Sequence, residues 1–453
     1  MYKADSKIAE EFIDHQEILD TLEYAHNNKS NRALIEQLID KAAQFKGLSH
    51  REAALLLECD QPDLTERIFR LAQEIKHKFY GNRIVMFAPL YLSNYCVNGC
   101  VYCPYHLKNK TIARKKLTQE EIRKEVIALQ DMGHKRLALE AGEDPLRNPI
   151  EYILESIQTI YSIKHKNGAI RRVNVNIAAT TVENYRKLKD AGIGTYILFQ
   201  ETYHKENYES LHPTGPKSKY AYHTEAMDRA MEAGIDDVGL GVLFGLNTYR
   251  YDFTGLLMHA EHLEATFGVG PHTISVPRIC PADDISTQDF PDAISDDIFC
   301  KIVAVIRIAV PLYRYDYLYK GIGCNPTQSL KPGNLTNQRR LPDQRRRLCH
   351  SGKHRKKTQH NFDISDTRTL DEVVNWLLDL GHIPSFCTAC YRAGRTGDPF
   401  YVISQIGTNR QLLRPQCIDD TKRVSGRLCG TGYTSQRNPT DKKMSWNIFP
   451  IRK

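Results

Sequence analysis

The sequence contains no apolar run long enough to cross a membrane, and its first 18 residues, MYKADSKIAEEFIDHQEI, are polar and charged rather than signal-like. It also has few cysteines for a disulfide scaffold, with 12 among 453 residues. We therefore expect a cytoplasmic protein with no membrane partner. In that compartment, clustered cysteines more often bind a metal or take part in catalysis.

Charge is unevenly distributed along the chain, although the net value is only +8. Residues 312–359 carry 12 Lys and Arg against 2 Asp, and residues 401–453 carry 10 against 3, which leaves −9 for the rest. A basic run is typical of a solvated tail or of a nucleic-acid-binding surface. Nucleic-acid binding is an open alternative, marked by salt-dependent affinity, but it is not the partner that we expect.

One stretch, NYCVNGCVYCPYHLKNK at residues 94–110, places Cys96, Cys100 and Cys103 in the spacing C-x3-C-x2-C. Zinc usually takes four ligands, so three cysteines make an incomplete zinc site. Three thiolates can instead hold a 4Fe-4S cluster with one iron open to a further ligand, whereas four thiolates would saturate the cluster. The motif therefore favours a catalytic cluster, with zinc or a structural cluster as the alternatives.

This cysteine motif, followed by alternating strands and helices, resembles the signature of radical S-adenosylmethionine (SAM) enzymes. Tyr102, just before the last cysteine, matches the aromatic residue of that family's loop and is a candidate cofactor-binding residue. The resemblance implies that Cys96, Cys100 and Cys103 bind a 4Fe-4S cluster whose open iron binds SAM.

The hydrophobic periodicity predicts an α/β protein in three parts. Residues 1–80 read as helices, with Ser30 and Ser49 as candidate N-caps, and we expect this extension to cap one end of a barrel. Residues 81–311 alternate six strands with helices, which predicts a parallel (βα)8 TIM-type barrel. Catalytic residues of such barrels lie at the C-terminal ends of the strands, and the cysteine loop follows the first strand.

Several polar residues at other strand ends are candidates for binding the cofactor. Gly142 and Glu143 stand where radical SAM enzymes carry a G-G-E motif, which by resemblance implies a contact with the SAM amino group. Glu201 ends the fourth strand and is a further candidate SAM ligand. Asn174 and Asn176 share one strand face, and either could reach the ribose, with Asn176 preferred. No side chain is assigned as a catalytic acid or base.

A second cysteine motif, FCTACYRAGRTGD, contains Cys387 and Cys390, a pair that alone could be half a zinc site or a redox pair. Together with CVNGCVYCPYH, QETYH and HPTGPK, it resembles the tyrosine lyases of FeFe-hydrogenase maturation, the HydG family. The related thiamine-pathway lyase ThiH, a 2-iminoacetate synthase, lacks this second motif and is the alternative enzyme. Residues 360–400 are then the region of an auxiliary cluster.

The HydG resemblance implies a reaction, a second cofactor and partners. A radical derived from SAM would break the Cα–Cβ bond of tyrosine, giving p-cresol and dehydroglycine. A second iron–sulfur cluster on Cys387 and Cys390 would convert the fragment into carbon monoxide and cyanide for the hydrogenase H-cluster. His272 matches the position that helps to bind a labile iron. The implied partners are other hydrogenase maturases, above all the scaffold protein.

The two basic segments, residues 312–359 and 401–453, do not resemble this family. A back-translation from Leu312, read one base later, gives YTGMIISTRESD, which is similar to the family's next strand, and similar shifts work elsewhere in both segments. We therefore hypothesise that both are read out of frame, which sequencing of the coding DNA would test. The seventh and eighth strands would then be lost, and Leu413 would replace the third ligand of the second cluster. A third alternative is a non-functional product that binds only one cluster.

Overall fold

The computed structural model describes residues 1–166, 168–279, 289–311, 314–318, 337–338, 369–386 and 388, with the backbone alone for 314–318 and 337–338. Its centre is an eight-stranded sheet in the order β11-β10-β9-β8-β7-β6-β3-β2, in which every neighbouring pair is parallel. These strands are β2 (Ala88–Ser93), β3 (Arg136–Ala141), β6 (Arg172–Asn176), β7 (Tyr196–Ile197), β8 (Val238–Gly241), β9 (Thr273–Ser275), β10 (Arg314–Leu318) and β11 (Asn337–Gln338).

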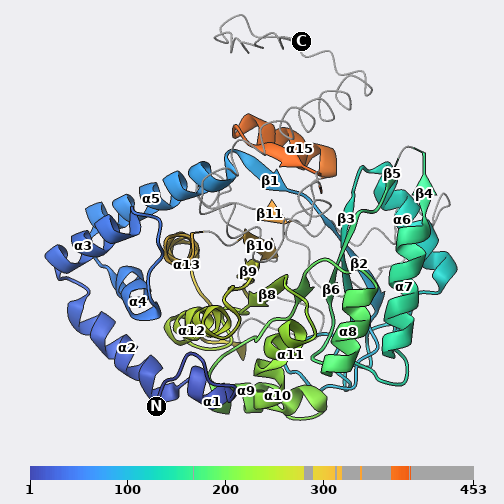
Figure 1. Cartoon of the computed structure of the whole chain (residues 1–453), viewed down its shortest axis with the longest axis horizontal. Helices are drawn as coiled ribbons and strands as arrows, with labels where there is room; N and C mark the ends of the chain where they lie inside the picture. Colours follow the sequence, from blue (N-terminus) through green and yellow to red (C-terminus); the bar gives the residue numbers. More distant parts are fainter. Residues whose placement is uncertain are drawn as a thin grey trace, which may run out of the picture.

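Helices follow the strands and surround the sheet (Figure 1). They are α6 (Gln119–Asp131), α7 (Ile150–Ser162), α8 (Val182–Asp190), α9 (Lys205–Leu211), α10 (Tyr220–Thr224), α11 (Ala226–Glu232), α12 (Tyr249–Phe267) and α13 (Asp296–Ala309), with the 3-10 turn η1 (Pro216–Ser218). A short antiparallel hairpin, β4 (Lys164–His165) with β5 (Gly168–Ala169), follows α7. The alternation of strand and helix confirms the prediction of a parallel, TIM-type α/β architecture.

The expected loss of the seventh and eighth strands is wrong. β10 pairs with β9, with Arg314 opposite Thr273, and β11 pairs with β10. Backbone groups make these bonds, so a strand can form here whichever side chains the reading frame supplies. Within the described strands, the hydrogen-bonded order runs from β11 to β2 without a pairing that joins these two ends. The remaining parts of 312–359, and all of 401–453, lie outside the described residues, so the reading-frame hypothesis stays a prediction.

The N-terminal extension is helical, as predicted, but it does not cap the end of the barrel. It comprises α1 (Ala9–Phe12), α2 (His15–Asn28), α3 (Arg32–Ala42), α4 (His50–Glu58) and α5 (Pro62–Tyr80). These helices form an outer layer beside α12 and α13 (Figure 1). The apolar outer faces of α12 and α13 explain this position, because α13 buries residues around most of its circumference and needs a second layer to cover them.

Local signals set several helix ends. Ser49 and Glu52 form a capping box at α4, as Thr118 and Glu121 do at α6. The prediction of Ser30 as an N-cap is wrong, because Asn31 is the residue whose side chain accepts the N–H of Leu34 in the first turn of α3.

The stretch RIVMFAPLYLS at residues 83–93, whose apolar run predicts the single strand before the cysteine loop, forms two strands. β1 (Arg83–Val85) leaves the main sheet and pairs with β12 (Ile383–Ser385), which follows α15 (Leu370–Asp379). The pairing brings the segment just before the second cysteine motif against the start of the barrel chain. β2 then enters the sheet and runs into the cysteine loop.

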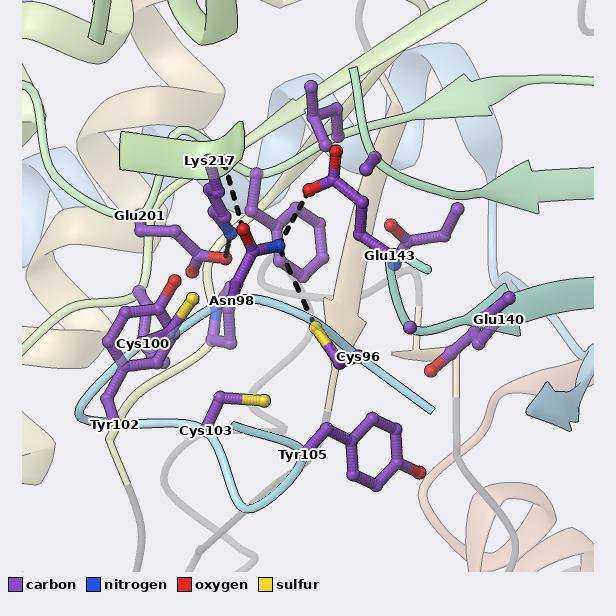
Figure 2. Close-up of a pocket in the computed structure, with 18 of the residues that line it drawn as sticks. Cys96, Asn98, Cys100, Tyr102, Cys103, Tyr105, Glu140, Glu143, Glu201 and Lys217 are labelled. Atoms are coloured by element: carbon purple, nitrogen blue, oxygen red, sulfur yellow. Dashed lines mark hydrogen bonds and ion pairs between the residues drawn. The ribbon is translucent and has the colours of Figure 1, made fainter. Parts of the chain in front are cut away.

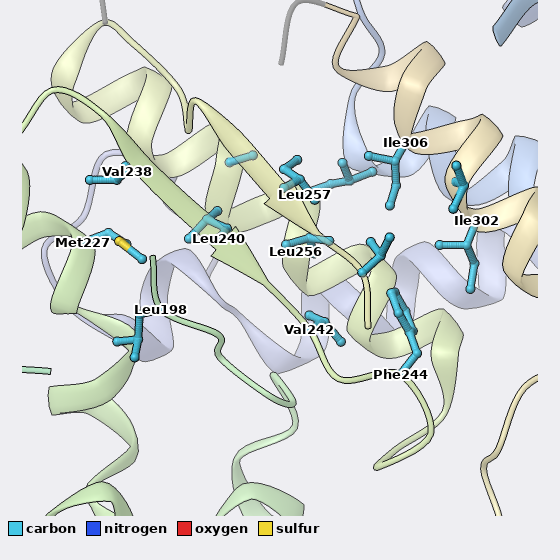
Figure 3. Packing of buried hydrophobic residues seen from close by; sticks show 14 of the residues in the cluster. Leu198, Met227, Val238, Leu240, Val242, Phe244, Leu256, Leu257, Ile302 and Ile306 are labelled. Carbon is cyan, nitrogen blue, oxygen red and sulfur yellow. The ribbon is translucent and has the colours of Figure 1, made fainter. Parts of the chain in front are cut away.

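The apolar core fills the space between the sheet and the surrounding helices. Figure 3 shows Leu240 and Val242 of the β8 region facing Leu256 of α12, with Ile302 and Ile306 of α13 beyond. All are buried, and each such side chain contributes about 1.5–3 kcal/mol of transfer free energy when removed from water. This packing fixes the strands, so that their C-terminal ends form a rigid rim for the loops that follow.

Candidate active site

The cysteine loop after β2 opens into a cavity of about 240 Å³ at the C-terminal ends of the strands. The structure brings together there every predicted residue of the first cluster and of the cofactor site: Cys96, Cys100, Cys103, Tyr102, Gly142, Glu143, Asn176 and Glu201. Figure 2 shows the three cysteines, Tyr102, Glu143 and Glu201 around this cavity. Each comes from the loop or strand end that the barrel prediction assigned to it.

The segment of residues 211–217 holds the cysteine loop in place from the side. Gly99 N–H donates to the carbonyl of Thr214 at 2.9 Å, and Val101 N–H donates to that of Leu211 at 3.0 Å. A Cβ on Gly99 would lie 2.3 Å from the Thr214 hydroxyl, so any larger residue would have to displace the Thr214 side chain. Backbone bonds at both positions fix the path of the chain between the cysteines.

Asn98, inside the cysteine loop, links three of the site's groups, and the sequence reading missed it. Its Nδ2 donates to Glu143 Oε2 at 2.6 Å and contacts Cys96 Sγ at 3.7 Å. Its Oδ1 accepts the backbone N–H of Lys217 at 3.0 Å. Asn98 therefore sets the position of Glu143 relative to the cysteine loop (Figure 2).

Lys217, which the sequence reading also missed, places a buried cation beside the thiols. Its Nζ lies 2.7 Å from Glu201 Oε1, and the two side chains are only 15% and 11% exposed. Burial would lower the pKa of Lys217, but the carboxylate of Glu201 raises it above its ordinary value, so the ammonium stays charged. This lysine is the last residue of the run HPTGPK, one of the motifs that carry the family resemblance, but the sequence does not show that its charge is buried.

The thiols differ in their environments before any metal binds. Burial raises the pKa of Cys100 to about 12, against the opposing charge of Lys217. Cys100 is therefore a neutral thiol at physiological pH, and a metal that binds there must displace its proton. Cys96 and Cys103 are partly exposed at the cavity.

Tyr102 is fixed by a buried histidine. Its hydroxyl lies 2.7 Å from Nε2 of His212, whose Nδ1 lies 2.6 Å from the carbonyl of Tyr208. A carbonyl can only accept, so Nδ1 carries the proton and Nε2 accepts from the tyrosine. Burial lowers the pKa of His212 to about 3, which keeps the imidazole neutral.

The structure distinguishes the roles of Gly142, just after β3, and of two asparagines in β6. A Cβ on Gly142 would lie 2.4 Å from the carbonyl oxygen of Tyr95, so the glycine lets β3 approach the cysteine loop. Asn176 lines the cavity, whereas Asn174 Oδ1 is occupied by Arg172 Nε and the Thr195 N–H, both at 3.1 Å. Asn174 is thus a buried structural residue, which leaves Asn176 for a ligand.

His272 lies at the other end of the barrel. It immediately precedes β9, while the cavity lies beyond the C-terminal end of that strand. Burial would raise the pKa of Asp237, but Arg172 and then His272 hold it below its ordinary value, which places His272 near this carboxylate. Arg278, after β9, lines the cavity and donates to Asp296 at 2.8 Å.

The second cysteine motif is described only up to its edge. Cys387 and Cys390 lie outside the described residues. Phe386, just before the motif, packs edge-on against His134, with ring centroids 5.4 Å apart. His134 precedes β3, so Phe386 and His272 lie toward the same, N-terminal end of the sheet.

Comparison with known proteins gives matches over the barrel and over the whole chain. The model of the radical SAM superfamily matches residues 90–252. The 2-iminoacetate synthase of Salmonella typhimurium is 31% identical over 244 residues, and that of Escherichia coli is 30% identical over the same length. These alignments cover 54% of this chain and 63% of each relative, so the chain spans less than two thirds of their length.

Solved structures match over nearly the full chain. A crystal structure of HydG, a maturase of the FeFe-hydrogenase, is 47% identical with a TM-score of 0.84, covering 92% of this chain and 93% of that one. HydG from Carboxydothermus hydrogenoformans is 34% identical with a TM-score of 0.74, covering 94% and 97%. Sequence identities of 47% and 34% over this length indicate a shared family as well as a shared fold.

Proposed function

Because this chain belongs to the HydG family of radical SAM proteins, we propose that it cleaves the Cα–Cβ bond of tyrosine to p-cresol and dehydroglycine. The dehydroglycine fragment would then be converted to carbon monoxide and cyanide for the H-cluster of an FeFe-hydrogenase. The observation that carries the proposal is one cavity lined by three cysteines of a single loop, by the carboxylate of Glu143, which accepts a hydrogen bond from Asn98, and by a buried Lys217–Glu201 pair.

The donors present fit a 4Fe-4S cluster and SAM. Cys96, Cys100 and Cys103 would hold the cluster with one iron open, since three thiolates fill three of its four external positions. Gly142 leaves room between β3 and the loop that a side chain would fill. The chemistry supplied when both cofactors are bound is cleavage of SAM to a 5′-deoxyadenosyl radical, which takes a hydrogen atom from tyrosine.

The remaining residues would bind and orient SAM. SAM carries an ammonium and a carboxylate on its amino-acid end, and the cavity offers Glu143 and Lys217 as opposite charges. Burial raises the pKa of Glu143, against the hydrogen bond from Asn98, so a bound ammonium would stabilise its ionised form. At the ribose, Asn176 would donate or accept a hydrogen bond and the carboxylate of Glu201 would accept one, with Tyr102 beside the loop.

A second cluster is the finer part of the proposal. It would be held by Cys387 and Cys390, with His272 binding a labile iron. Its support is positional, since His272 and Phe386, the residue before Cys387, lie toward the same end of the sheet, opposite the first cluster. Fragments formed at one end would then be used at the other, with the barrel between them excluding water.

The partners and location proposed with this function are those of the family. Tyrosine would be the substrate, and a scaffold maturase would receive the iron-bound product in the cytoplasm. In the part of the chain that the structure describes, none of the helices combines the length and apolar character of a membrane span.

The experiment is anaerobic reconstitution with iron and sulfide, followed by incubation with SAM, tyrosine and dithionite. We expect 5′-deoxyadenosine and p-cresol in wild-type protein and neither in Cys100→Ser. Cys59→Ser is the matched control, because Cys59 is a buried free cysteine outside the cavity, and it should retain both products. SAM cleavage without p-cresol would overturn the tyrosine substrate.

The alternative enzyme is a 2-iminoacetate synthase, favoured by the 31% identity to that protein. It would give p-cresol without cyanide. Iron content distinguishes a further alternative, a chain with a single cluster, at about four iron ions per chain rather than about eight. Cyanide formation together with the higher iron content would support the full HydG reaction.

A further inference from the structure

The cysteine loop and the residues that follow it carry exposed apolar and basic side chains. Val101, between two of the cysteines, is 46% exposed, and Leu107 is 59% exposed. Lys108 and Lys110 follow Leu107 closely in the chain and are also exposed. We call Val101, Leu107, Lys108 and Lys110 the loop patch. It is the part of the surface that is nearest in the chain to the predicted cluster ligands.

Hydrogen bonds hold the backbone of the loop patch in place. Leu107 N–H donates to the carbonyl of Asn98 at 2.8 Å, as Val101 does to that of Leu211. The guanidinium of Arg114 donates to the carbonyls of Tyr105 and His106, at 2.8 and 2.7 Å. The two apolar side chains are therefore presented to water from a fixed backbone.

The charge around the loop patch is of one sign. Residues 94–117 contain five Lys and Arg and no acidic residue, in a chain whose net charge outside the two basic segments is −9. Lys115 is paired with Glu121, and Arg114 is used by the loop carbonyls. Lys108 and Lys110 have no acidic partner among the described residues, so their charges face solvent.

We propose that the loop patch docks a small acidic electron-carrier protein, which reduces the cluster of the cysteine loop. The inference rests on the proposed function, which requires one electron for each SAM cleaved. The carrier loses that electron and the cluster gains it, and no proton moves at the patch. Val101 places the partner within one residue of Cys100, and Lys108 and Lys110 would attract its acidic face.

The form of the patch suits such an encounter. Complexes of electron carriers are small and short-lived, with buried areas below about 1,200 Å², and they rely on charge for orientation. Two apolar side chains with two free lysines match this type, rather than the larger apolar surface of a permanent partner.

The first test measures binding and does not depend on catalysis. Oxidised flavodoxin, an acidic flavoprotein, is titrated into reconstituted wild-type protein and the variant Lys108→Glu/Lys110→Glu at low and high salt. We expect the variant to bind at least about tenfold more weakly at low salt, and wild-type affinity to fall as salt rises. The matched control, Lys46→Glu/Lys164→Glu, has the same change in net charge at two exposed lysines elsewhere and should bind like wild type.

The second test compares electron sources. With flavodoxin, its reductase and NADPH, the loop-patch variant should form 5′-deoxyadenosine about tenfold more slowly than wild type, whereas dithionite, a small reductant, should drive both at equal rates. Equal loss with both reductants, equal binding by all variants, or a change of oligomeric state in the variant would overturn the docking proposal. Absence of SAM cleavage by wild type with dithionite would instead contradict the proposed function.

Discussion

The carboxylate of Asp252 in α12 accepts the backbone N–H of Tyr203 at 2.8 Å, and this bond fixes the turn that carries Glu201 into the cavity. The same oxygen, Oδ1, accepts the hydroxyl of Thr202, also at 2.8 Å. Glu201 has a φ of 73°, a left-handed conformation that costs a non-glycine residue about 1–2 kcal/mol. Asp252 is thus a positioning residue. It touches no ligand, but it holds Glu201 in its strained conformation.

Asp252→Asn and Asp252→Ala should differ in their effect on SAM binding. Asparagine keeps an oxygen at Oδ1, so both hydrogen bonds and the turn should survive, with SAM affinity within about threefold of wild type. Alanine removes both acceptors, and the Glu201 turn should relax, weakening SAM binding at least about tenfold. Equilibrium dialysis of reconstituted protein measures both. Equal affinities for the two variants would contradict the positioning role.

The stability of the protein should also depend on the ionisation of Asp252. Burial raises its pKa to about 7, against the bonds from Tyr203 and Thr202, while the unfolded chain has its ordinary value. The folded state therefore holds a proton that the unfolded state releases, so this contribution is complete below about pH 4 and is lost as pH rises through about 7. Asp252→Asn cannot titrate, so it should gain on wild type by about 2 kcal/mol or more between pH 5 and 8 in urea unfolding. A constant difference across this range would refute the assignment.

Removing the cation of the Lys217–Glu201 pair should destabilise the fold more than removing both charges. Lys217→Met leaves a buried carboxylate without its partner, at a cost of about 3–5 kcal/mol. Lys217→Met/Glu201→Gln should recover much of that stability but not SAM binding. Lys205→Met is the control, since its 2.9 Å pair with Glu10 is exposed and should cost below about 1 kcal/mol. Denaturant midpoints measure all three; SAM binding by the double variant would exclude a direct role for the pair.

The sequence was most informative where the site is local in the chain. Cys96, Cys100 and Cys103 share one loop, and Gly142, Glu143, Asn176 and Glu201 lie at the C-terminal end of a strand or within a few residues after it, so barrel topology alone brings them to one rim. Whether each binds the ligand assigned to it stays a prediction.

Residues that reach the site from distant loops could not be found this way. Lys217 meets the cysteine loop through Asn98, across 119 residues, and no periodicity encodes that contact. The sequence led to the opposite error at residues 314–318. Their sequence does not resemble the family, so no strand is expected, yet their backbone pairs with β9. Pairing of β1 with β12 joins segments 300 residues apart in the chain, which the pattern of a single long strand concealed.

The bond between Tyr102 and His212 should orient the tyrosine ring without contributing much to iron binding. His212→Phe leaves the buried hydroxyl without an acceptor, at a cost of about 1–3 kcal/mol, and the ring should turn to seek another partner. Iron content should stay at the wild-type value, because the cysteine loop is held by Gly99 and Val101, while the KM for SAM should rise several-fold, by about 1 kcal/mol.

The double variant His212→Phe/Tyr102→Phe separates orientation from packing. It removes the hydroxyl together with its acceptor, so no buried polar group is left unpaired and the ring can return to its place. SAM affinity in the double variant should therefore exceed that of His212→Phe alone. If the double variant is the weaker of the two, the hydroxyl itself binds the ligand, and His212 acts as more than its anchor.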